Sequence, residues 1–499
     1  MLITFAQHQG RKFTQMLSRA EQKRFGQFMT PASIASFMAL RMVASVNLHH
    51  VRVLDPAAGA GVLAAAVVEA LLAKSVRPQR IELSMFELDA RLLPALRQLA
   101  TRMAEACRAE GVEFDVSIAN ADFLLSDLAL SGQPVDGLLT IANPPFFKLN
   151  KANDVRAQAH AYAVHGQPNI YSLFMAACAR LTPANGRWCF ITPRSWMAGA
   201  YFKAARHSLL RHLTLDSLHA FDSRKEGFEE DAVLQETVIA WATGRSVADA
   251  GASVLLTRSR GAEDLDAAQV VALPRQRIVG ADDEAMLSLP AEGADPFEGW
   301  TATLATFGLE VSTGPVIAFR AAEYIRERDE PGTVPLLWLQ HIGQQQIFWP
   351  VRKKREHMLA SAANAWMMVR NEPMVVMRRF SPKEDERRVT CAAYCGRLPG
   401  HVLGLENHLN YIHRPGGRMT VSEARGLSGF LASRVVDGHF RALCGSTQVN
   451  ATELRRLPLP PLQVIESIGS RLSDKPGLIE IDAVVDRALG IEAGERTAA

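Results

Sequence analysis

The sequence predicts an α/β protein whose first half folds into a parallel sheet with helices on both faces. Two observations support this fold. Short apolar segments typical of strands alternate with helical segments between residues 51 and 245, which is the pattern of a parallel sheet covered on both sides. A polar residue also follows most of these strands directly. The composition agrees, because 499 residues with 48% hydrophobic and 21% charged residues are typical of a soluble globular protein and exclude a disordered or collagen-like chain.

The elements of this first half can be placed in order along the chain. Strands are expected at 51–54, 81–86, 114–118, 135–142 and 187–192, and helices at 62–73, 90–108 and 170–181. The polar residues close to strand ends are Asp55, Glu87, Asp122 and Asn143. Because ligands of such sheets bind beyond the carboxyl ends of the strands, we expect these four side chains to face one cleft.

The charge pattern changes twice after residue 245. Residues 245–300 contain 10 acidic and 5 basic residues, and we interpret this part as an acidic connecting region. Residues 351–390 contain 10 basic and 5 acidic residues, and aromatic residues alternate with the basic ones. A solvated charged surface is the simpler explanation of such a segment, but the mixture of cations and aromatic rings favours contact with nucleic acid.

The six cysteines are too scattered for a disulfide framework. Cys391 and Cys395 are the one close pair, and without a second pair they do not predict a metal site. The N-terminus lacks a basic region followed by an apolar core, and the most apolar run, 62–73, is shorter than the roughly 20 residues that a membrane helix needs. We therefore expect a cytoplasmic protein with reduced thiols, no membrane segment and no metal.

The segment from Asp55 to Gly61 reads Asp-Pro-Ala-Ala-Gly-Ala-Gly and lies between a strand and a helix. Glycines let the backbone turn tightly and approach a ligand, whereas the phosphate-binding pattern GxxxxGK[ST] is absent. A carboxylate at the strand tip suits a cationic ligand such as S-adenosylmethionine, which carries an ammonium and a sulfonium group. Glu87 is expected to accept hydrogen bonds from ribose hydroxyls, and Asp122 from the exocyclic amine of an adenine. A tight turn without a ligand is the alternative interpretation.

The sequence Asn143-Pro144-Pro145-Phe146 follows the fourth strand. Prolines lack a backbone N–H and fix φ, which leaves neighbouring carbonyl groups without ladder partners. The amide oxygen of Asn143 and the carbonyl oxygen of Pro144 are two close acceptors, to which a planar NH2 group can donate one hydrogen each. Phe146 offers a flat face to the ring that carries this amine. The motif therefore predicts a site for a planar aromatic amine.

These motifs resemble those of S-adenosylmethionine-dependent amino-methyltransferases, and more narrowly those of the gamma class of DNA adenine-N6 methyltransferases. Four further segments resemble motifs of the same family, the last of them as in modification enzymes of type II restriction–modification systems such as the PstI type: 24–31, 168–174, 191–196 and 446–454. The resemblance implies a Rossmann-like S-adenosylmethionine-dependent methyltransferase domain with a C-terminal mixed α+β target-recognition domain. The expected boundaries are 1–245 for the catalytic domain, 246–300 for the acidic connecting region, 301–462 for target recognition and 463–499 for a helical tail.

The resemblance also implies the role of individual residues. The catalytic residues would be Asn143, Pro144 and Phe146. The cofactor would be bound by Thr30, Asp55, Ala57, Gly59, Gly61, Glu87, Asp122 and Asn143. The flipped base and the DNA would be bound by Pro145, Phe228, Arg378 and Arg379. The implied reaction is methyl transfer from S-adenosylmethionine to the N6 amine of a flipped adenine in double-stranded DNA, by an expected monomer that works beside a separate restriction endonuclease.

Three other functions are compatible with parts of the sequence. Enzymes that methylate an RNA base or a protein glutamine resemble it in using Asn-Pro-Pro-aromatic, but they are usually shorter and do not explain the segment 24–31. A fused restriction–modification enzyme would need a nuclease, and we find no convincing PD…(D/E)xK set after residue 250. A DNA-binding specificity subunit without catalysis would not need an intact motif at 143–146.

Overall fold

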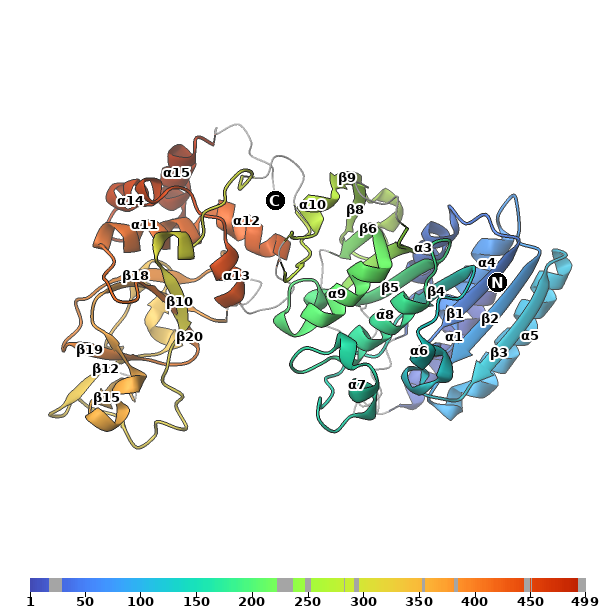
Figure 1. Cartoon of the computed structure of the whole chain (residues 1–499), viewed down its shortest axis with the longest axis horizontal. Coiled ribbons are helices and arrows are strands. Elements are labelled where there is room, and N and C mark those ends of the chain that lie inside the picture. Colours follow the sequence, from blue (N-terminus) through green and yellow to red (C-terminus); the bar gives the residue numbers. More distant parts are fainter. Residues whose placement is uncertain are drawn as a thin grey trace. The chain divides into compact units, whose positions relative to one another are not determined.

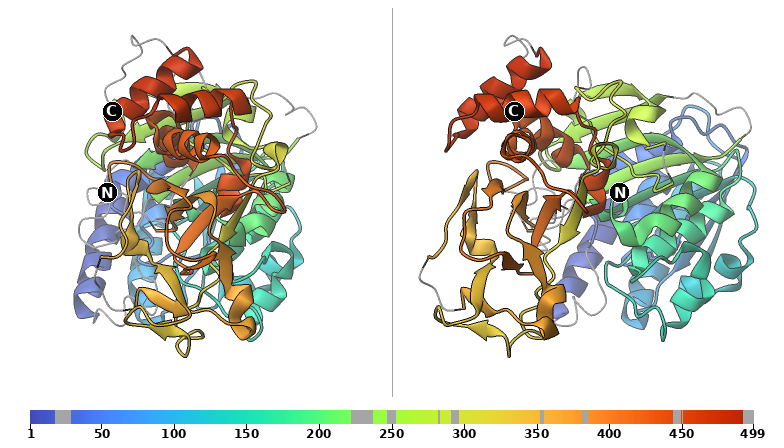
Figure 2. Two further views of the ribbon diagram at one scale, coloured as in Figure 1. Left: turned by 90° about the vertical axis from the view of Figure 1, so that its left-hand side faces the viewer. Right: turned by 60° about the vertical axis from the view of Figure 1, so that its left-hand side comes forward.

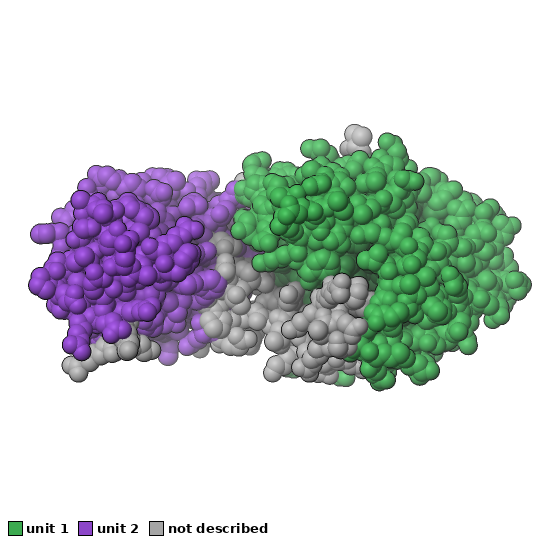
Figure 3. All heavy atoms as spheres, turned by 90° about the horizontal axis from the view of Figure 1, so that it is seen from below, with its two compact units in different colours: residues 1–289 green, residues 290–499 purple. Residues whose placement is uncertain are grey.

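The computed structural model describes residues 1–17, 29–221, 237–246, 253–281, 283–290, 296–351, 355–380, 385–443, 449 and 451–491. The chain divides into two compact units, Met1–Leu289 and Pro290–Ala499 (Figure 3). Each unit has hydrophobic cores of its own.

Unit 1 is built on a nine-stranded sheet in the order β3-β2-β1-β4-β5-β7-β6-β8-β9 (Figure 1). The strands are β1 (His50–Asp55), β2 (Arg80–Phe86), β3 (Glu113–Ala119), β4 (Leu138–Ala142), β5 (Arg187–Pro193), β6 (Leu213–Phe221), β7 (Thr237–Gly244), β8 (Ser253–Ser259) and β9 (Val270–Pro274). Strands β1 to β5 are parallel to one another, whereas β7 runs antiparallel between β5 and β6. The strand order reverses at β1 and β4, and this reversal opens a crevice at their carboxyl ends.

Helices cover both sides of this sheet (Figure 2). They are α1 (Leu2–Met16), α3 (Ala32–Val43), α4 (Val62–Leu72), α5 (Leu93–Ala109), α6 (Asp127–Ser131), α7 (Val155–Ala159), α8 (Ile170–Leu181), α9 (Lys203–His212) and α10 (Arg275–Ile278). Helices α1, α3, α4 and α5 pack on one another and share one apolar core, while α6 and α9 pack on α8 and share the other. Along β1, Val53 faces the first core and Leu54 the second, as strand alternation requires. The predicted α/β fold is confirmed.

Residues 246–300 were expected to form an acidic connecting region, but two strands within them belong to the sheet of unit 1. Strand β8 pairs in parallel with β6, and β9 pairs with β8, so both extend the sheet of unit 1. Unit 1 therefore reaches Leu289 instead of ending at residue 245. The boundary moves because β8 pairs with β6, a strand far from it in the sequence, and such pairing cannot be predicted from charge composition.

Unit 2 is a mixed α+β structure with a four-stranded sheet (β10-β20-β17-β18), a five-stranded sheet (β11-β15-β12-β19-β16) and a hairpin (β13-β14). The strands are β10 (Glu310–Thr313), β11 (Ile325–Arg326), β12 (Thr333–Leu337), β13 (Ile342–Gly343), β14 (Gln346–Ile347), β15 (His357–Leu359), β16 (Met368–Arg370), β17 (Pro373–Arg378), β18 (Cys391–Cys395), β19 (Val402–Leu405) and β20 (Leu409–His413). The helices are α11 (Val421–Ala432), α12 (Arg434–Leu443), α13 (Ala451–Arg456), α14 (Leu462–Arg471) and α15 (Leu478–Leu489).

The expected helical tail belongs to the body of unit 2. Helix α14 packs on α11, and α15 packs on both α11 and α14. Their residues Ile465, Ile468, Ile481 and Val485 are buried in the same core as the helices before them. No helix among the described residues combines the length and the hydrophobicity that crossing a membrane requires.

Candidate active site

The loop between β1 and α4 carries two glycines in the left-handed backbone region. Gly59 has φ +54° and Gly61 has φ +82°, and Gly61 caps the N-terminus of α4. The amide N–H of Gly59 donates to Oε2 of Glu87 over 2.8 Å. A Cβ atom on Gly61 would lie 2.5 Å from Cδ2 of Leu99. Gly59 therefore links the loop to the end of β2, whereas Gly61 allows α5 to pack closely against the loop.

Asp55, the last residue of β1, is fully buried. Its Oδ1 accepts a hydrogen bond from the amide of Ala57 at 3.4 Å, and its Oδ2 has no hydrogen-bond partner among the residues that the structure describes. Burial raises the pKa of Asp55 to about 7, the Ala57 amide opposes this rise, and the nearby charge of Glu87 adds to it. A buried carboxyl with an unused oxygen gains from a cation close by.

Glu87 is also buried, and both of its oxygens face backbone amides. Oε2 accepts from Gly59, and Oε1 accepts from Asp89 at 2.7 Å. Burial raises the pKa of Glu87 to about 7, although these two amides lower it. Each carboxylate oxygen can accept more than one hydrogen bond, so Glu87 can still bind a hydroxyl group.

Asp122 precedes a short 3-10 helix (Phe123–Leu125), and its Oδ1 accepts from the amide of Leu124 at 3.0 Å. Its Oδ2 lies 3.5 Å from Nη1 of Arg156, a residue of α7. Arg156 also binds the carboxylate of Asp154 with two nitrogens, at 2.9 and 2.6 Å. No sequence pattern indicates Arg156 as a site residue, because Arg156 approaches Asp122 only in the folded chain.

A cavity of about 440 Å³ lies between these elements. Its walls are formed by Met29, Pro56, Ala57, Gly59, Phe86, Glu87, Leu88, Asp89, Ala121, Asp122, Phe123, Asn143, Pro145, Phe147, Arg156, Ile170 and Phe174. The structure thus brings Glu87, Asp122 and Asn143 to one cavity, as the sequence predicted. The expectation is wrong for Asp55, the fourth of these side chains, which is fully buried and is absent from the wall, as is Gly61.

Asn143 comes directly after β4 and is half-buried. Its amide nitrogen Nδ2 donates to the hydroxyl oxygen of Thr30 over 3.0 Å. Thr30 is buried, and it lies next to the cavity without being part of its wall. The structure therefore brings Thr30 to Asn143, although 113 residues separate the two along the chain.

The prolines and phenylalanines after Asn143 differ in their surroundings. Pro144 is buried, whereas Pro145 and Phe147 line the cavity. Phe146 is half-buried and meets the ring of Tyr171 edge-on, with 5.8 Å between the ring centroids.

Tyr171 was not among the residues that we expected in the site. It is fully buried in α8, and its hydroxyl lies 2.8 Å from Oγ of Ser195. The ring of Tyr171 stacks on that of Phe202, with 5.4 Å between the ring centroids, so packing on both sides restricts the ring that contacts Phe146. Phe228, the expected second aromatic residue against the base, lies outside the described residues.

The two arginines expected to contact DNA are half-buried in unit 2. Nε of Arg378 donates to the carbonyl oxygen of Ile342 at 2.6 Å, and Nη1 of Arg379 donates to that of Asn407 at 3.0 Å. Each guanidinium keeps further N–H groups that can donate to other acceptors, so a structural role and a phosphate contact are compatible.

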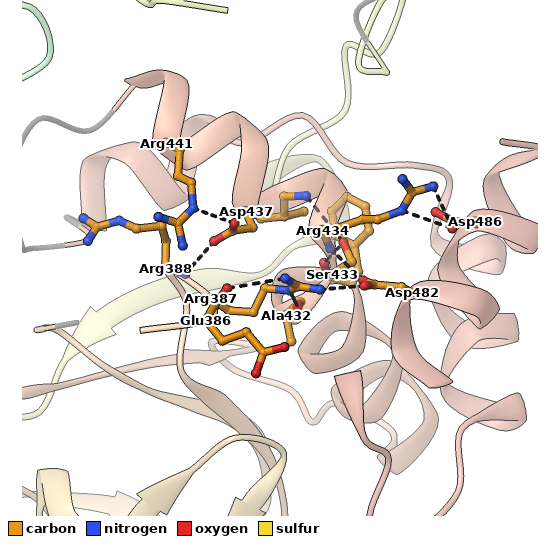
Figure 4. A network of polar contacts seen from close by, with 12 residues as sticks. Glu386, Arg387, Arg388, Ala432, Ser433, Arg434, Asp437, Arg441, Asp482 and Asp486 are labelled. Carbon is orange, nitrogen blue, oxygen red and sulfur yellow. Dashed lines mark hydrogen bonds and ion pairs between the residues drawn. The ribbon is translucent and has the colours of Figure 1, made fainter. Parts of the chain in front are cut away.

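Two other arginines of the basic segment serve the internal packing of unit 2. Nη2 of Arg387 lies 2.6 Å from Oδ2 of Asp482 on α15, and the backbone amide of Arg388 donates to Asp437 at 2.6 Å (Figure 4). Arg434 binds Asp486 of the same helix α15 at 2.9 Å. The contacts of Arg387 and Arg434 hold α15 against the rest of unit 2, so the positive charge of Arg387, which belongs to the segment 351–390, is used within the fold.

Comparisons with known proteins agree with this site. Residues 139–228 match the family described as Eco57I restriction-modification methylase. The chain is 29% identical over 494 residues to the type II methyltransferase M.PstI of Providencia stuartii, covering 95% of this chain and 94% of that one. It is 30% identical over 487 residues to the type II methyltransferase M.BsuBI of Bacillus subtilis, covering 94% of each chain.

The chain belongs to the type II methyltransferases. This methyltransferase is a site-specific DNA-modifying enzyme, and its cofactor is S-adenosylmethionine. Among solved structures it is similar to the DrdV–DNA complex, with a TM-score of 0.49 and 14% identity over 94% of this chain and 59% of that one.

The residues of the cavity fit this cofactor. The aromatic rings of Phe86, Phe123, Phe147 and Phe174 form flat apolar walls that suit a heteroaromatic base. Glu87 places a carboxyl group in the cavity wall, and the buried carboxyl group of Asp55 ends β1 directly before the loop, which suits a cationic sulfonium compound.

Proposed function

We propose that this methyltransferase modifies the N6 amine of an adenine that is flipped out of double-stranded DNA. The observation that supports this most directly is the position of Asn143. It lies after β4, at the wall of the cavity, with its amide nitrogen bound to Thr30. The amide oxygen Oδ1 is the acceptor end of the same group, and an acceptor suits an amine donor.

Cofactor binding follows from the carboxylates of the cavity. Glu87 accepts from the ribose hydroxyls and Asp122, held by Arg156, accepts from the amine of the cofactor's adenine ring. The negative charge of the ionised Asp55, which lies outside the cavity wall, attracts the cationic cofactor. The small residues Ala57 and Gly59 of the wall let the backbone approach the cofactor closely. S-adenosylmethionine supplies an electrophilic methyl group on its sulfonium.

The target amine needs activation because its nitrogen lone pair is delocalised into the adenine ring. The Asn143 amide oxygen and the Pro144 carbonyl oxygen each accept one of its hydrogens, and this geometry releases the lone pair toward the methyl group. Phe146, supported by Tyr171, stacks on the flipped ring and offsets the few kcal/mol that extrusion from the duplex costs. Pro145 adds to the wall of the site. Alignment of amine and methyl supplies much of the rate.

Unit 2 is proposed to recognise the DNA sequence, with Arg378 and Arg379 among its DNA contacts. Arg320, Arg328, Arg355 and Arg370 of this unit are exposed and add positive charge to its surface. Phosphate contacts from such residues position a protein on DNA. The enzyme works as a monomer in the cytoplasm and protects DNA from a separate restriction endonuclease of the same specificity.

The test is to express the chain alone in cells that lack DNA methylation and to sequence the modified bases. N6-methyladenine at one short sequence is expected, confirmed by mass spectrometry of the digested nucleosides. Methylation of cytosine, of RNA or of protein glutamine, or cleavage of unmodified DNA by the purified chain, would contradict the proposal.

A further inference from the structure

Arg156 is held in the cavity wall by contacts with three other residues. Its Nε and Nη2 donate to the two carboxylate oxygens of Asp154, at 2.9 and 2.6 Å. Its Nη1 lies 3.5 Å from Oδ2 of Asp122, and its guanidinium carbon lies 5.7 Å from the centroid of the Phe147 ring. Asp122, Phe147 and Arg156 line the cavity, whereas Asp154 is outside the wall. The guanidinium thus joins a carboxylate of the wall to one outside it.

The segment that carries Arg156 is fixed to the body of unit 1. Its two ends are joined, because the backbone amide of Ile170 donates to the carbonyl oxygen of Phe147 at 2.9 Å. Within it, Asp154 caps α7 by accepting from the backbone amide of Arg156 at 2.9 Å, and Ala157 of α7 is buried in the same core as α8. Arg156 therefore approaches Asp122 from a backbone that is itself held in place.

The two carboxylates do not share the guanidinium equally. The short distances to Asp154 are typical of strong charge-assisted hydrogen bonds, and these bonds lower the pKa of Asp154 and raise that of Arg156. Asp122 is held more loosely, since Oδ1 accepts from the amide of Leu124 at 3.0 Å and Oδ2 faces Arg156 at 3.5 Å. Each carboxylate oxygen can accept more than one hydrogen bond. Asp122 is therefore restrained at both oxygens and can still accept from a ligand.

We propose that Arg156 is a positioning residue that sets the preference of the cofactor site for an adenine ring, because it holds the Asp122 carboxylate toward the exocyclic amine. This inference rests on the proposed contact between Asp122 and that amine. Without the guanidinium, Asp122 keeps its bond from the Leu124 amide at one oxygen, and its side chain, which is 18% exposed, can turn toward water. An ionised carboxylate only accepts hydrogen bonds, so a purine that lacks the amine gains nothing from this arrangement.

The experiment measures, by calorimetry on the full chain, the affinity for two ligands. One is S-adenosylhomocysteine, and the other is its analogue with a hydrogen in place of the 6-amine of the purine ring. The wild-type protein is expected to bind the first about tenfold or more tightly than the second, as for a hydrogen bond to a charged group. Arg156→Met keeps the apolar stem of the side chain and removes the guanidinium. It is expected to weaken S-adenosylhomocysteine by about tenfold, as for loss of a coupled partner, and the analogue by less than about twofold.

Two further variants separate positioning from folding. Arg156→Lys keeps a cation, but its single nitrogen cannot bind both oxygens of Asp154 while a second nitrogen faces Asp122. It is expected to show the same selective loss at a smaller size, and it tests the idea again if Arg156→Met unfolds, as thermal melting will show. Arg52→Met is the matched control, because Arg52 of β1 pairs with Glu82 at 3.0 Å and is outside the cavity wall. It is expected to bind both ligands as the wild type does.

The two ligands and the two forms of residue 156 make a cycle that isolates the amine contact. Equal losses for both ligands in the Arg156 variants would overturn the inference, because a residue that only shapes the wall, or that binds another part of the cofactor, weakens both. Unchanged affinities in Arg156→Met, or the same selective loss in Arg52→Met, would also overturn it. Equal binding of the two ligands by the wild-type protein would instead refute the proposed contact between Asp122 and the amine.

Discussion

Cofactor affinity is expected to fall as the pH falls from 8 to 6, because the pKa values of two buried carboxyl groups beside the cofactor loop are raised. Burial raises the pKa of both Asp55 and Glu87 to about 7. A cationic cofactor binds the ionised forms better, so protonation at low pH opposes binding. Consider a carboxyl group that has a pKa near 7 in the cofactor-free enzyme and must be ionised in the complex. One such group changes the affinity for the cofactor by about tenfold between pH 8 and pH 6, and two such groups change it by at most about a hundredfold.

Isothermal titration calorimetry measures both the affinity and the proton release. At pH 7 each group is about half protonated, so binding is expected to release about half a proton per group, visible as a binding enthalpy that depends on the buffer. Glu87→Gln removes its share of this proton release as well as a cofactor contact. Glu82→Gln is the matched control, because Glu82 lies on the same strand and pairs with Arg52 at the surface. Equal affinities at pH 6 and pH 8, with no buffer dependence of the enthalpy, would show that neither carboxyl group ionises when the cofactor binds.

Asn143→Ala is expected to lower single-turnover methyl transfer by about 100-fold or more, as for loss of one positioned hydrogen-bonding group in other active sites, while cofactor and DNA binding persist. Gly61→Ala is expected to destabilise unit 1 by about 1–3 kcal/mol in a denaturant titration, because φ is +82° and the new Cβ would meet Leu99. Replacing Arg378 and Arg379 with Ala is expected to flatten the log–log salt dependence of DNA binding by about 0.9 per lost phosphate contact, and to lower the thermal midpoint, because both residues also bind backbone carbonyls.

Each of these predictions has a control or a contradicting result. A near wild-type rate, or a lost cofactor affinity, in Asn143→Ala would mean that its role is misassigned. Gly111→Ala is the control for Gly61, because Gly111 also has positive φ, at +72°, but no atom of the described residues lies within 4 Å of an added Cβ. Equal losses of stability in the two variants would show that the contact with Leu99 adds nothing. Unchanged salt dependence in the double arginine variant would show that this pair serves only the fold.

Sequence patterns were most informative where structure depends on neighbours along the chain. The helix expected at 170–181 has these same bounds, and the strand expected at 187–192 extends one residue further. Hydrophobic periodicity and turn residues are local signals, so such elements can be placed from the sequence. The carboxyl ends of parallel strands must meet at one edge of a sheet, and for this reason Glu87, Asp122 and Asn143 could be expected in one cleft before the fold was known.

The α/β class, the methyltransferase motifs and the shared cleft could be predicted from the amino-acid sequence, because they depend on local pattern and on strand direction. The partners of residues far apart along the chain became known from the folded structure. In this structure β8 and β9 belong to the main sheet, Arg156 forms an ion pair with Asp122, and Asn143 donates a hydrogen bond to Thr30. The structure also showed that Arg387 of the basic segment binds Asp482 within unit 2. Such pairings depend on how side chains meet after the chain has folded, and no period or spacing along the sequence encodes them.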